Sequence, residues 1–259
     1  MQNPLYSIAK TVVEIQVYIG DHTLIALDIE TAPLDTYRDN EKAALDSQKA
    51  SITGISLSVA ESTGIYIPLR HRTGGNASPA EVIPWLTEHV LTNPAVMLCC
   101  HNLSFESAFF YALGIIIQPP VYDTICAAQM TLKSATAFRT LTDSGLKTLV
   151  PELLGVELPS FGEVTGDRHF DELDPDDPNT VCYACSDADY TLRLYHLFNN
   201  WLDRWLPKHR YIVEQIESPS AVYVGLMRHN GLLVNVALME KNGKKRKNGS
   251  QGSRKRSLS

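Results

Sequence analysis

Two acidic residues at the end of an apolar run constrain the fold of this chain more than any other feature. Asp28 and Glu30 follow Leu24-Ile25-Ala26-Leu27, a run whose composition predicts a buried strand. Successive side chains of a strand point to opposite faces, so these two carboxylates share one face. Taken alone, such a pair is also typical of a solvated strand end, so the other acidic segments decide how it is interpreted.

Two further segments each carry an acidic residue at helical spacing from another polar residue. Asn102 and Glu106 are four residues apart, and so are Tyr183 and Asp187. On helices this spacing puts the members of each pair on one side. If the fold brings the segments together, four carboxylates converge. Clusters with oxygen ligands alone suit hard divalent metals, so the pattern predicts a site for Mg²⁺ or Mn²⁺.

Two such cations are suited to hydrolysis of a phosphodiester. Held roughly 3.5–4 Å apart, they stabilise both the attacking and the leaving oxygen, and one of them lowers the pKa of its bound water. Tyr183 lies one turn before Asp187 and is placed to hold that water through its hydroxyl. Because the ordinary pKa of tyrosine is about 10, we expect it to orient the water rather than act as a free base.

The order of the three motifs, DIET, HNLSFE and YACSDAD, resembles that of the DEDD 3′–5′ exonucleases, in the subtype with tyrosine in the third motif. The likeness points to the proofreading domain of family A DNA polymerases, the DNA polymerase I type, including phage versions. It runs from about Leu24 to Leu202. The resemblance implies a ribonuclease-H-like α/β fold, a mixed β-sheet flanked by helices. It also implies a two-metal 3′–5′ exonuclease acting on a single-stranded or frayed 3′ end of DNA.

The resemblance assigns the catalytic roles position by position. Asp28, Glu30 and Asp187 match the ligands of the tighter metal. Glu106 matches the residue that serves the second metal, partly through water, and Tyr183 matches the water-orienting position. All five are therefore expected to be catalytic, and the four carboxylates to be metal ligands.

The resemblance also assigns substrate-binding positions. Leu34 falls where the family wedges a leucine against the terminal base, and Phe161 where it places an aromatic ring near the unpaired 3′ bases. Asn102 matches the motif asparagine, which supports the site and the substrate. Thr31, the last residue of DIET, is expected to contact the substrate as well.

One departure from the family pattern keeps alternative functions open. The family more often has aspartate where this chain has Glu106. The extra methylene shifts the carboxylate by about a bond length, and productive geometry tolerates little misplacement. We expect Glu106 to serve nonetheless, because contacts to the second metal are looser. The alternatives are an inactive remnant that acts only as a nucleic-acid-binding or structural module, and an RNA-trimming exonuclease of the same superfamily.

Two other polar features carry weaker signals. His101 precedes the motif asparagine and is expected to be a packed neighbour rather than a base. Cys182 and Cys185 form a C-x-x-C, but the sequence has no second cysteine pair, so zinc is not expected.

Charge is distributed unevenly along the chain. Residues 241–259 hold 8 of the 23 Lys and Arg residues and no acidic residue, so the other 240 carry 15 basic and 29 acidic residues. An acidic body does not favour gripping nucleic acid over a broad surface. It is consistent with an enzyme that engages a few nucleotides through metal ions.

Composition also bounds the cellular setting. The five cysteines, an odd number, favour reduced thiols and a cytoplasmic protein. No apolar run approaches the roughly 18 residues of a membrane span, and the N-terminus lacks the plan of a signal peptide. We expect neither a membrane nor an obligate protein partner.

Hydrophobic periodicity predicts alternating strands and helices. The predicted strands cover residues 11–19, 24–28, 52–59, 64–69 and 95–100. The predicted helices follow Ser78 and cover residues 104–113, 123–132, 145–154 and 179–201. Residues 31–49 are expected to be irregular with one short helix, and residues 161–177 to be an acidic loop.

Three regions are expected along the chain. Residues 1–205 form the exonuclease domain, and residues 206–240 resemble the start of a family A polymerase domain, beginning with its first helix at 211–230. The palm, fingers and thumb are not present, so the chain is expected to be truncated and to lack polymerase activity. Residues 241–259 are a low-complexity basic tail that is expected to be disordered. A frame slip or a premature end in a polymerase gene would produce such a tail.

Overall fold

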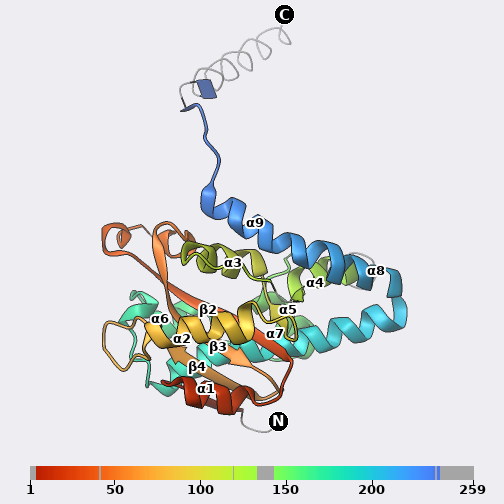
Figure 1. The fold of residues 1–259 in the computed structure, drawn as a ribbon, viewed down its shortest axis with the longest axis horizontal. Coiled ribbons are helices and arrows are strands. Elements are labelled where there is room, and N and C mark those ends of the chain that lie inside the picture. Colours follow the sequence, from red (N-terminus) through yellow and green to blue (C-terminus); the bar gives the residue numbers. More distant parts are fainter. Residues whose placement is uncertain (1–3, 41, 119, 133–142, 237, 240–259) are drawn as a thin grey trace, which may run out of the picture. The chain divides into compact units, whose positions relative to one another are not determined.

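The computed structural model describes residues 4–40, 42–118, 120–132, 143–236 and 238–239 (Figure 1). Residues Met1–His229 form one compact unit, and Asn230–Ser259 form another. The predicted basic tail, residues 241–259, lies outside the described residues. Within the described part of the chain, no helix is both long and apolar enough to cross a membrane.

A six-stranded mixed sheet forms the centre of the first unit. Its strand order is β1-β4-β3-β2-β5-β6. β2 pairs antiparallel with β3 and parallel with β5, which places it inside the sheet. The strands are β1 (Leu5–Ile8), β2 (Leu24–Pro33), β3 (Ala50–Ser58), β4 (Thr63–Pro68), β5 (Met97–Cys100) and β6 (Val121–Asp123).

Helices cover both faces of this sheet, so the predicted α/β class is confirmed (Figure 1). One face packs against α1, α2 and α3, and the other packs against α4, α5 and the long helix α7. The helices are α1 (Val12–Ile19), α2 (Pro79–Leu86), α3 (Leu103–Ala112), α4 (Thr124–Leu132), α5 (Leu146–Leu154), α6 (Phe161–Thr165), α7 (Pro178–Trp205), α8 (Pro207–Ile212) and α9 (Ser218–Asn230).

The alternation of β2 between the two faces determines where the acidic pair lies. Leu27 belongs to the apolar cluster on the α1–α3 face, whereas Ala26 belongs to the cluster on the α7 face. Asp28 and Glu30 follow Ala26 in steps of two residues, so they lie on the α7 face. β3 and β4, both predicted as strands, pair antiparallel and form a hairpin beside β2.

The segment predicted as a strand over 11–19 is helix α1, so that prediction is wrong. Thr11 accepts a hydrogen bond from the amide of Glu14, whose side chain accepts one from the amide of Thr11. This capping box starts a helix and overrides the alternating pattern. Helical spacing buries Ile15, while Val17, expected on the same side of a strand, is 77% exposed.

Two segments predicted to be irregular contain more structure than expected. β2 continues to Pro33, and short 3₁₀ turns follow at Asp35–Tyr37 and Ala43–Leu45. The acidic segment 161–177 contains helix α6 and a further 3₁₀ turn at Phe170–Glu172. The other predicted strands and helices are confirmed, with ends shifted by a few residues.

The helices after α7 pack continuously against the sheet domain. A π turn at Val213–Glu217 joins α8 to α9, and Val213 is fully buried. The hydroxyl of Ser218 accepts a hydrogen bond of 2.9 Å from the amide of Asp123 at the end of β6. The functional boundary between residues 205 and 206 stays a prediction, although the packing runs across it.

Candidate active site

Three of the predicted metal ligands meet where α7 crosses β2. Asp28, Glu30 and Asp187 each offer a carboxylate oxygen, and these atoms lie within 4.8 Å of one another. Glu30 and Asp187 are buried and Asp28 is partly buried. The strand supplies two carboxylates because of its two-residue repeat, and the helix supplies the third from the opposite side.

Burial and mutual repulsion disfavour the charged forms of this cluster. The pKa of Asp28 is raised well above its ordinary value, first by burial and then by the charge of Asp187. The pKa of Glu30 is raised by burial and then by Asp28. Burial also raises the pKa of Asp187. A divalent cation would reverse these shifts, so the all-oxygen donor set fits Mg²⁺ or Mn²⁺.

Glu106 lies on α3 beside the cluster but outside the group of three. Its side chain is buried, and Oε2 has no hydrogen-bond partner among the described residues. Burial raises its pKa well above the ordinary value, and the charge of Asp28 raises it further. A buried carboxylate oxygen without a partner is costly unless a cation or water satisfies it, which is consistent with the predicted role.

Tyr183 is held beside the carboxylates by aromatic packing. Its ring lies 5.8 Å from that of Phe170 and 6.3 Å from that of Phe161, measured between centroids. Burial raises its pKa, and so do the charges of Glu30 and Asp187. The hydroxyl therefore keeps its proton at neutral pH and can orient a water but cannot accept a proton as a free base.

Lys147 on α5 is a site residue that the sequence analysis missed. Its ammonium forms an ion pair with Oδ1 of Asp187 and lies 4.6 Å from the centre of the Tyr183 ring. The segment resembles an ordinary amphipathic helix. A faint signal was present, because a lysine in the first turn of a helix is unfavourable to the helix dipole.

The two predicted base-contacting residues present their side chains to solvent. Leu34, just after β2, is 43% exposed, and Phe161, at the start of α6, is 46% exposed. Exposed large apolar side chains beside a polar cluster are available for stacking or wedging against a base.

The two polar substrate positions are engaged within the fold. The hydroxyl of Thr31 donates a 2.7 Å hydrogen bond to the carbonyl of Ala44. Asn102 occupies the N-cap of α3 in a left-handed conformation, with φ at 80°, and its side chain accepts a hydrogen bond from Ser104 rather than capping the helix. The amide of Asn102 donates to Asp123, which fixes the start of the helix that carries Glu106.

His101, discounted as a base, is a packed neighbour of the site. Its Nδ1 lies 2.7 Å from the hydroxyl of Thr124. Burial lowers the pKa of His101 to about 4, so the ring is neutral at physiological pH.

Asp171 links two segments that approach the site, a second feature that the sequence analysis missed. Its carboxylate accepts hydrogen bonds of 2.8 and 2.9 Å from Arg38 and one of 2.9 Å from Arg72. Arg38 lies in the segment that follows Leu34. The neighbour of Asp171, Phe170, packs against Tyr183, so one buried carboxylate connects the Leu34 segment with the aromatic wall of the site.

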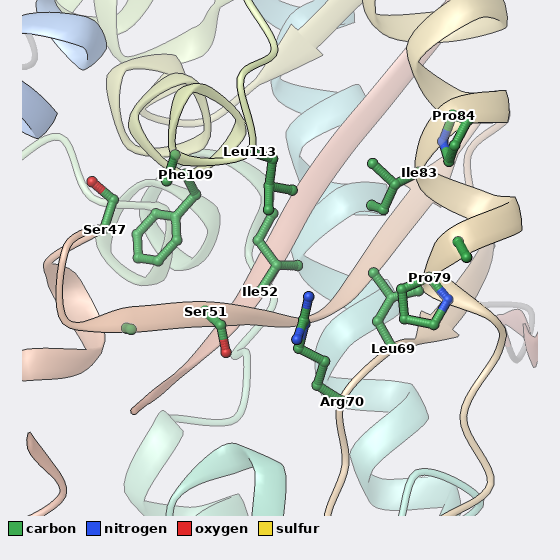
Figure 2. Close-up of a pocket in the computed structure, with 13 residues that line it drawn as sticks. Ser47, Ser51, Ile52, Leu69, Arg70, Pro79, Ile83, Pro84, Phe109 and Leu113 are labelled. Carbon is green, nitrogen blue, oxygen red and sulfur yellow. The ribbon is translucent and has the colours of Figure 1, made fainter. Parts of the chain in front are cut away.

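A surface pocket lies on the other face of the sheet. Figure 2 shows Phe109 of α3 and Leu113, the residue after α3, facing Ile83 of α2 across Ile52 of β3. Its lining includes Arg70 but none of the carboxylates of the site, so we assign it no part in the chemistry.

Comparison with known families decides the assignment. A 3′–5′ exonuclease family profile matches residues 9–203, the stretch that contains the carboxylates, Tyr183 and Lys147. This chain belongs to the 3′–5′ exonuclease domain family of DNA polymerase I. The resemblance noted from the three motifs is thereby confirmed.

Relatives of this exonuclease domain are DNA polymerases I of bacteria. The enzyme of Pseudomonas aeruginosa is 24% identical over 219 residues, which cover 82% of this chain and 23% of the relative. The enzyme of Chloroflexus aurantiacus is 29% identical over 162 residues, covering 60% of this chain and 16% of the relative. The chain thus spans less than a quarter of the length of these curated relatives.

Solved structures confirm the ribonuclease-H-like exonuclease fold. Brucella melitensis NrnC superposes with a TM-score of 0.60 at 17% identity, covering 90% of this chain and 98% of that one. Escherichia coli RNase D, an exoribonuclease, superposes with a TM-score of 0.57 at 16% identity, covering 88% of this chain and 51% of that one.

Proposed function

We propose that this exonuclease domain removes nucleotides from the 3′ end of DNA by metal-dependent hydrolysis, as the proofreading part of a DNA polymerase. The observation that carries the proposal is the convergence of Asp28, Glu30 and Asp187 within 4.8 Å, inside a chain of the 3′–5′ exonuclease family. The identity of the curated relatives as DNA polymerases favours DNA over RNA.

The residues present fit two divalent cations, Mg²⁺ or Mn²⁺. Asp28, Glu30 and Asp187 would hold one, and Glu106, with its unpartnered buried oxygen, would serve the other. Such ions supply charge stabilisation to the attacking and leaving oxygens and make hydroxide available near neutral pH. Tyr183 would orient the attacking water through its protonated hydroxyl.

Leu34 and Phe161 would hold the terminal bases of the substrate. Both side chains are close to half exposed, and both belong to segments that the Asp171 contacts tie to the site. Packing and stacking against bases tolerate any sequence, which suits an enzyme that removes whichever nucleotide is frayed. The substrate partner is accordingly a single-stranded or frayed 3′ end.

The setting proposed for this activity is the cytoplasm. All five cysteines of the chain are free thiols in the structure, and Cys99 and Cys100 are buried. Free thiols are typical of reducing compartments.

An inactive remnant is the second candidate. Glutamate at position 106 favours it, and so does the ion pair of Lys147 with Asp187, which engages a proposed metal ligand. The unpartnered oxygen of Glu106 and the unbroken first and third motifs oppose it.

One assay tests the proposal against both alternatives. A 5′-labelled single-stranded DNA oligonucleotide is incubated with Mg²⁺, Mn²⁺ or EDTA, next to an RNA of the same sequence. We expect stepwise shortening of the DNA from its 3′ end with either metal and none with EDTA. The variant Asp28→Asn with Glu30→Gln, which keeps side-chain volume, controls for contaminating nucleases. No shortening would favour the inactive remnant, and metal-independent shortening or faster shortening of RNA would also contradict the proposal.

A further inference from the structure

We propose that Lys147 is a built-in counter-ion of the carboxylate cluster, which a divalent cation has to displace from Asp187 in order to bind. This inference deepens the proposed function and rests on it for the identity of the competing cation. Lys147 is a positioning residue in this scheme, because it acts through Asp187 and touches no reacting atom.

Lys147 contacts two residues of the third motif, Tyr183 and Asp187. Its Nζ donates to Oδ1 of Asp187 and lies 4.6 Å from the centre of the Tyr183 ring. Both partners are negative or electron-rich, so the ammonium is attracted by a carboxylate and by a ring face at once. The Lys147 side chain is 34% exposed and that of Asp187 is 12% exposed. The ammonium therefore has a route to water, while the carboxylate has little.

The charge of Lys147 acts on the whole cluster rather than on one residue. Its partner Asp187 offers an oxygen within 4.8 Å of one from Asp28 and one from Glu30, so the positive charge attracts all three carboxylates. These three carboxylates carry up to three negative charges within 4.8 Å. Without a metal, the lysine offsets part of the repulsion that would otherwise force protons onto them.

A metal and the lysine cannot both use the same oxygen lone pair. Mg²⁺ and Mn²⁺ bind carboxylate oxygens directly, so an ammonium bonded to Oδ1 of Asp187 takes one of the lone pairs that a cation could use and places a like charge beside it. Lysine is suited to yield, because its compact charge sits on a flexible four-carbon stem. Arginine would hold the carboxylate with two fixed donors and give way less readily.

Calorimetric titration with MnCl₂, in the absence of nucleic acid, tests the competition. We expect Lys147→Met to bind Mn²⁺ about tenfold more tightly than wild type, because the competing charge is gone. Lys147→Arg should bind Mn²⁺ no more tightly than wild type. Lys49→Met is the matched control, since Lys49 is similarly exposed and pairs with a single aspartate, Asp46, and its Mn²⁺ affinity should not change.

A side-chain measurement reads the displacement itself. The ¹H–¹⁵N signal of the Lys147 ammonium, assigned by its absence in Lys147→Arg, should be visible in the metal-free protein. Saturation with Mg²⁺ should broaden or shift it, as the ion pair with Asp187 breaks. A signal that Mg²⁺ leaves in place would overturn the inference.

The outcomes separate this inference from the proposed function. If Mn²⁺ binds wild type and Lys147→Met equally, or binds the variant more weakly, Lys147 is not a competitor, although the metal site stands. If Mn²⁺ binds neither, the metal site and the proposed function fail together. Should Lys147→Met not fold, as judged by thermal unfolding, Lys147→Gln replaces it with the same expectations.

Discussion

At the level of single residues, the site is a set of carboxyl groups whose surroundings disfavour their charged forms. Asp28, Glu30 and Glu106 have raised pKa values, first because they are buried and then because each lies near another carboxylate. The pKa of Tyr183 is raised as well, by burial and by the nearby carboxylates. A bound cation removes the repulsion between these carboxylates. The free energy that this repulsion costs the metal-free protein is therefore regained when the metal binds.

The first residue-scale prediction concerns stability against pH without metal. A carboxyl whose folded pKa is raised stabilises the fold while both states are protonated, and that stability is lost as pH rises through the folded pKa. Asp28→Asn with Glu30→Gln should therefore unfold roughly 2–4 °C higher than wild type at pH 8. The difference should shrink as the pH falls to 5.

Measuring the difference between the two proteins removes the effect of other groups. His71 and His101 have lowered pKa values, so the stability that they contribute is lost as the pH falls. This loss is the same in both proteins and cancels in the difference. Thermal unfolding in EDTA at each pH is the measurement. A wild type more stable than the variant at pH 8 would show that the cluster is not self-repelling.

The second residue-scale prediction separates positioning of water from metal binding. Tyr183→Phe removes the hydroxyl and keeps the ring that packs against Phe161 and Phe170. Turnover at saturating Mn²⁺ should fall by about 10²-fold, because orientation of a reactant contributes a large part of the barrier. The Mn²⁺ affinity should change by less than about twofold. Strongly weakened Mn²⁺ binding with normal turnover would assign the tyrosine a different role.

At the level of helices and strands, three elements, β2, α3 and α7, carry the proposed catalytic residues. α7 brings Tyr183 and Asp187 to the face of β2, and α3 brings Glu106. Arg38, in the segment after the proposed base-contacting residue Leu34, is paired with Asp171. The neighbour of Asp171, Phe170, stacks on Phe161, the other proposed base-contacting residue. The segments around the site are thus held in place by an ion-pair cluster that contains none of the proposed catalytic residues.

Asp171→Asn tests this element-scale link. The change removes the charge from a carboxylate whose side chain is 8% exposed, and it leaves Arg38 paired with Glu172 and Arg72 paired with Asp35. We expect a loss of about 3 kcal/mol in the free energy of unfolding. KM for a short DNA should rise about tenfold while kcat falls less, since binding of the 3′ end is disturbed and the metal ligands are not. An unchanged KM would show that the two segments hold their positions without the ion pairs.

Spacing predicted that Asp28 and Glu30 share one face of a strand and that Tyr183 and Asp187 share one side of a helix. That these segments meet was implied only by the resemblance of the three motifs to a known family. Lys147 could not be predicted, since its partner is 40 residues away and only tertiary packing joins them. Helix α1 was missed for a local reason. Its alternating residues satisfy a strand pattern, and the Thr11–Glu14 capping box, which favours a helix, was not weighed.

At the level of the whole molecule, charge is concentrated at the far end of the sequence. The last 19 residues carry eight positive charges, and the remainder of the chain has a large acidic excess. The proposed chemistry lies between Asp28 and Asp187, far from those residues along the sequence. We therefore expect electrostatic attraction for long DNA to be separable from the proposed catalysis at the 3′ end.

Cutting the chain after Glu240 tests this separation. We expect turnover on a tetranucleotide to stay within about twofold of the full chain at low and moderate salt. Binding of long DNA should weaken and become less dependent on salt, because fewer counterions are released. Loss of tetranucleotide turnover, or unfolding of the shortened chain, would mean that the tail contributes to the fold.

The packing of α9 on α3 has a consequence for how the chain can be divided. A Cβ placed on Gly225 would lie 2.5 Å from the Cβ of Ser107, so the two helices meet at contact distance next to Glu106. Val213 and Ser218 are fully buried, and residues 207–229 belong to the same compact unit as the central sheet. Two separate polypeptides, 1–206 and 207–230, should therefore complement each other, and neither should give the thermal transition of the intact chain by itself.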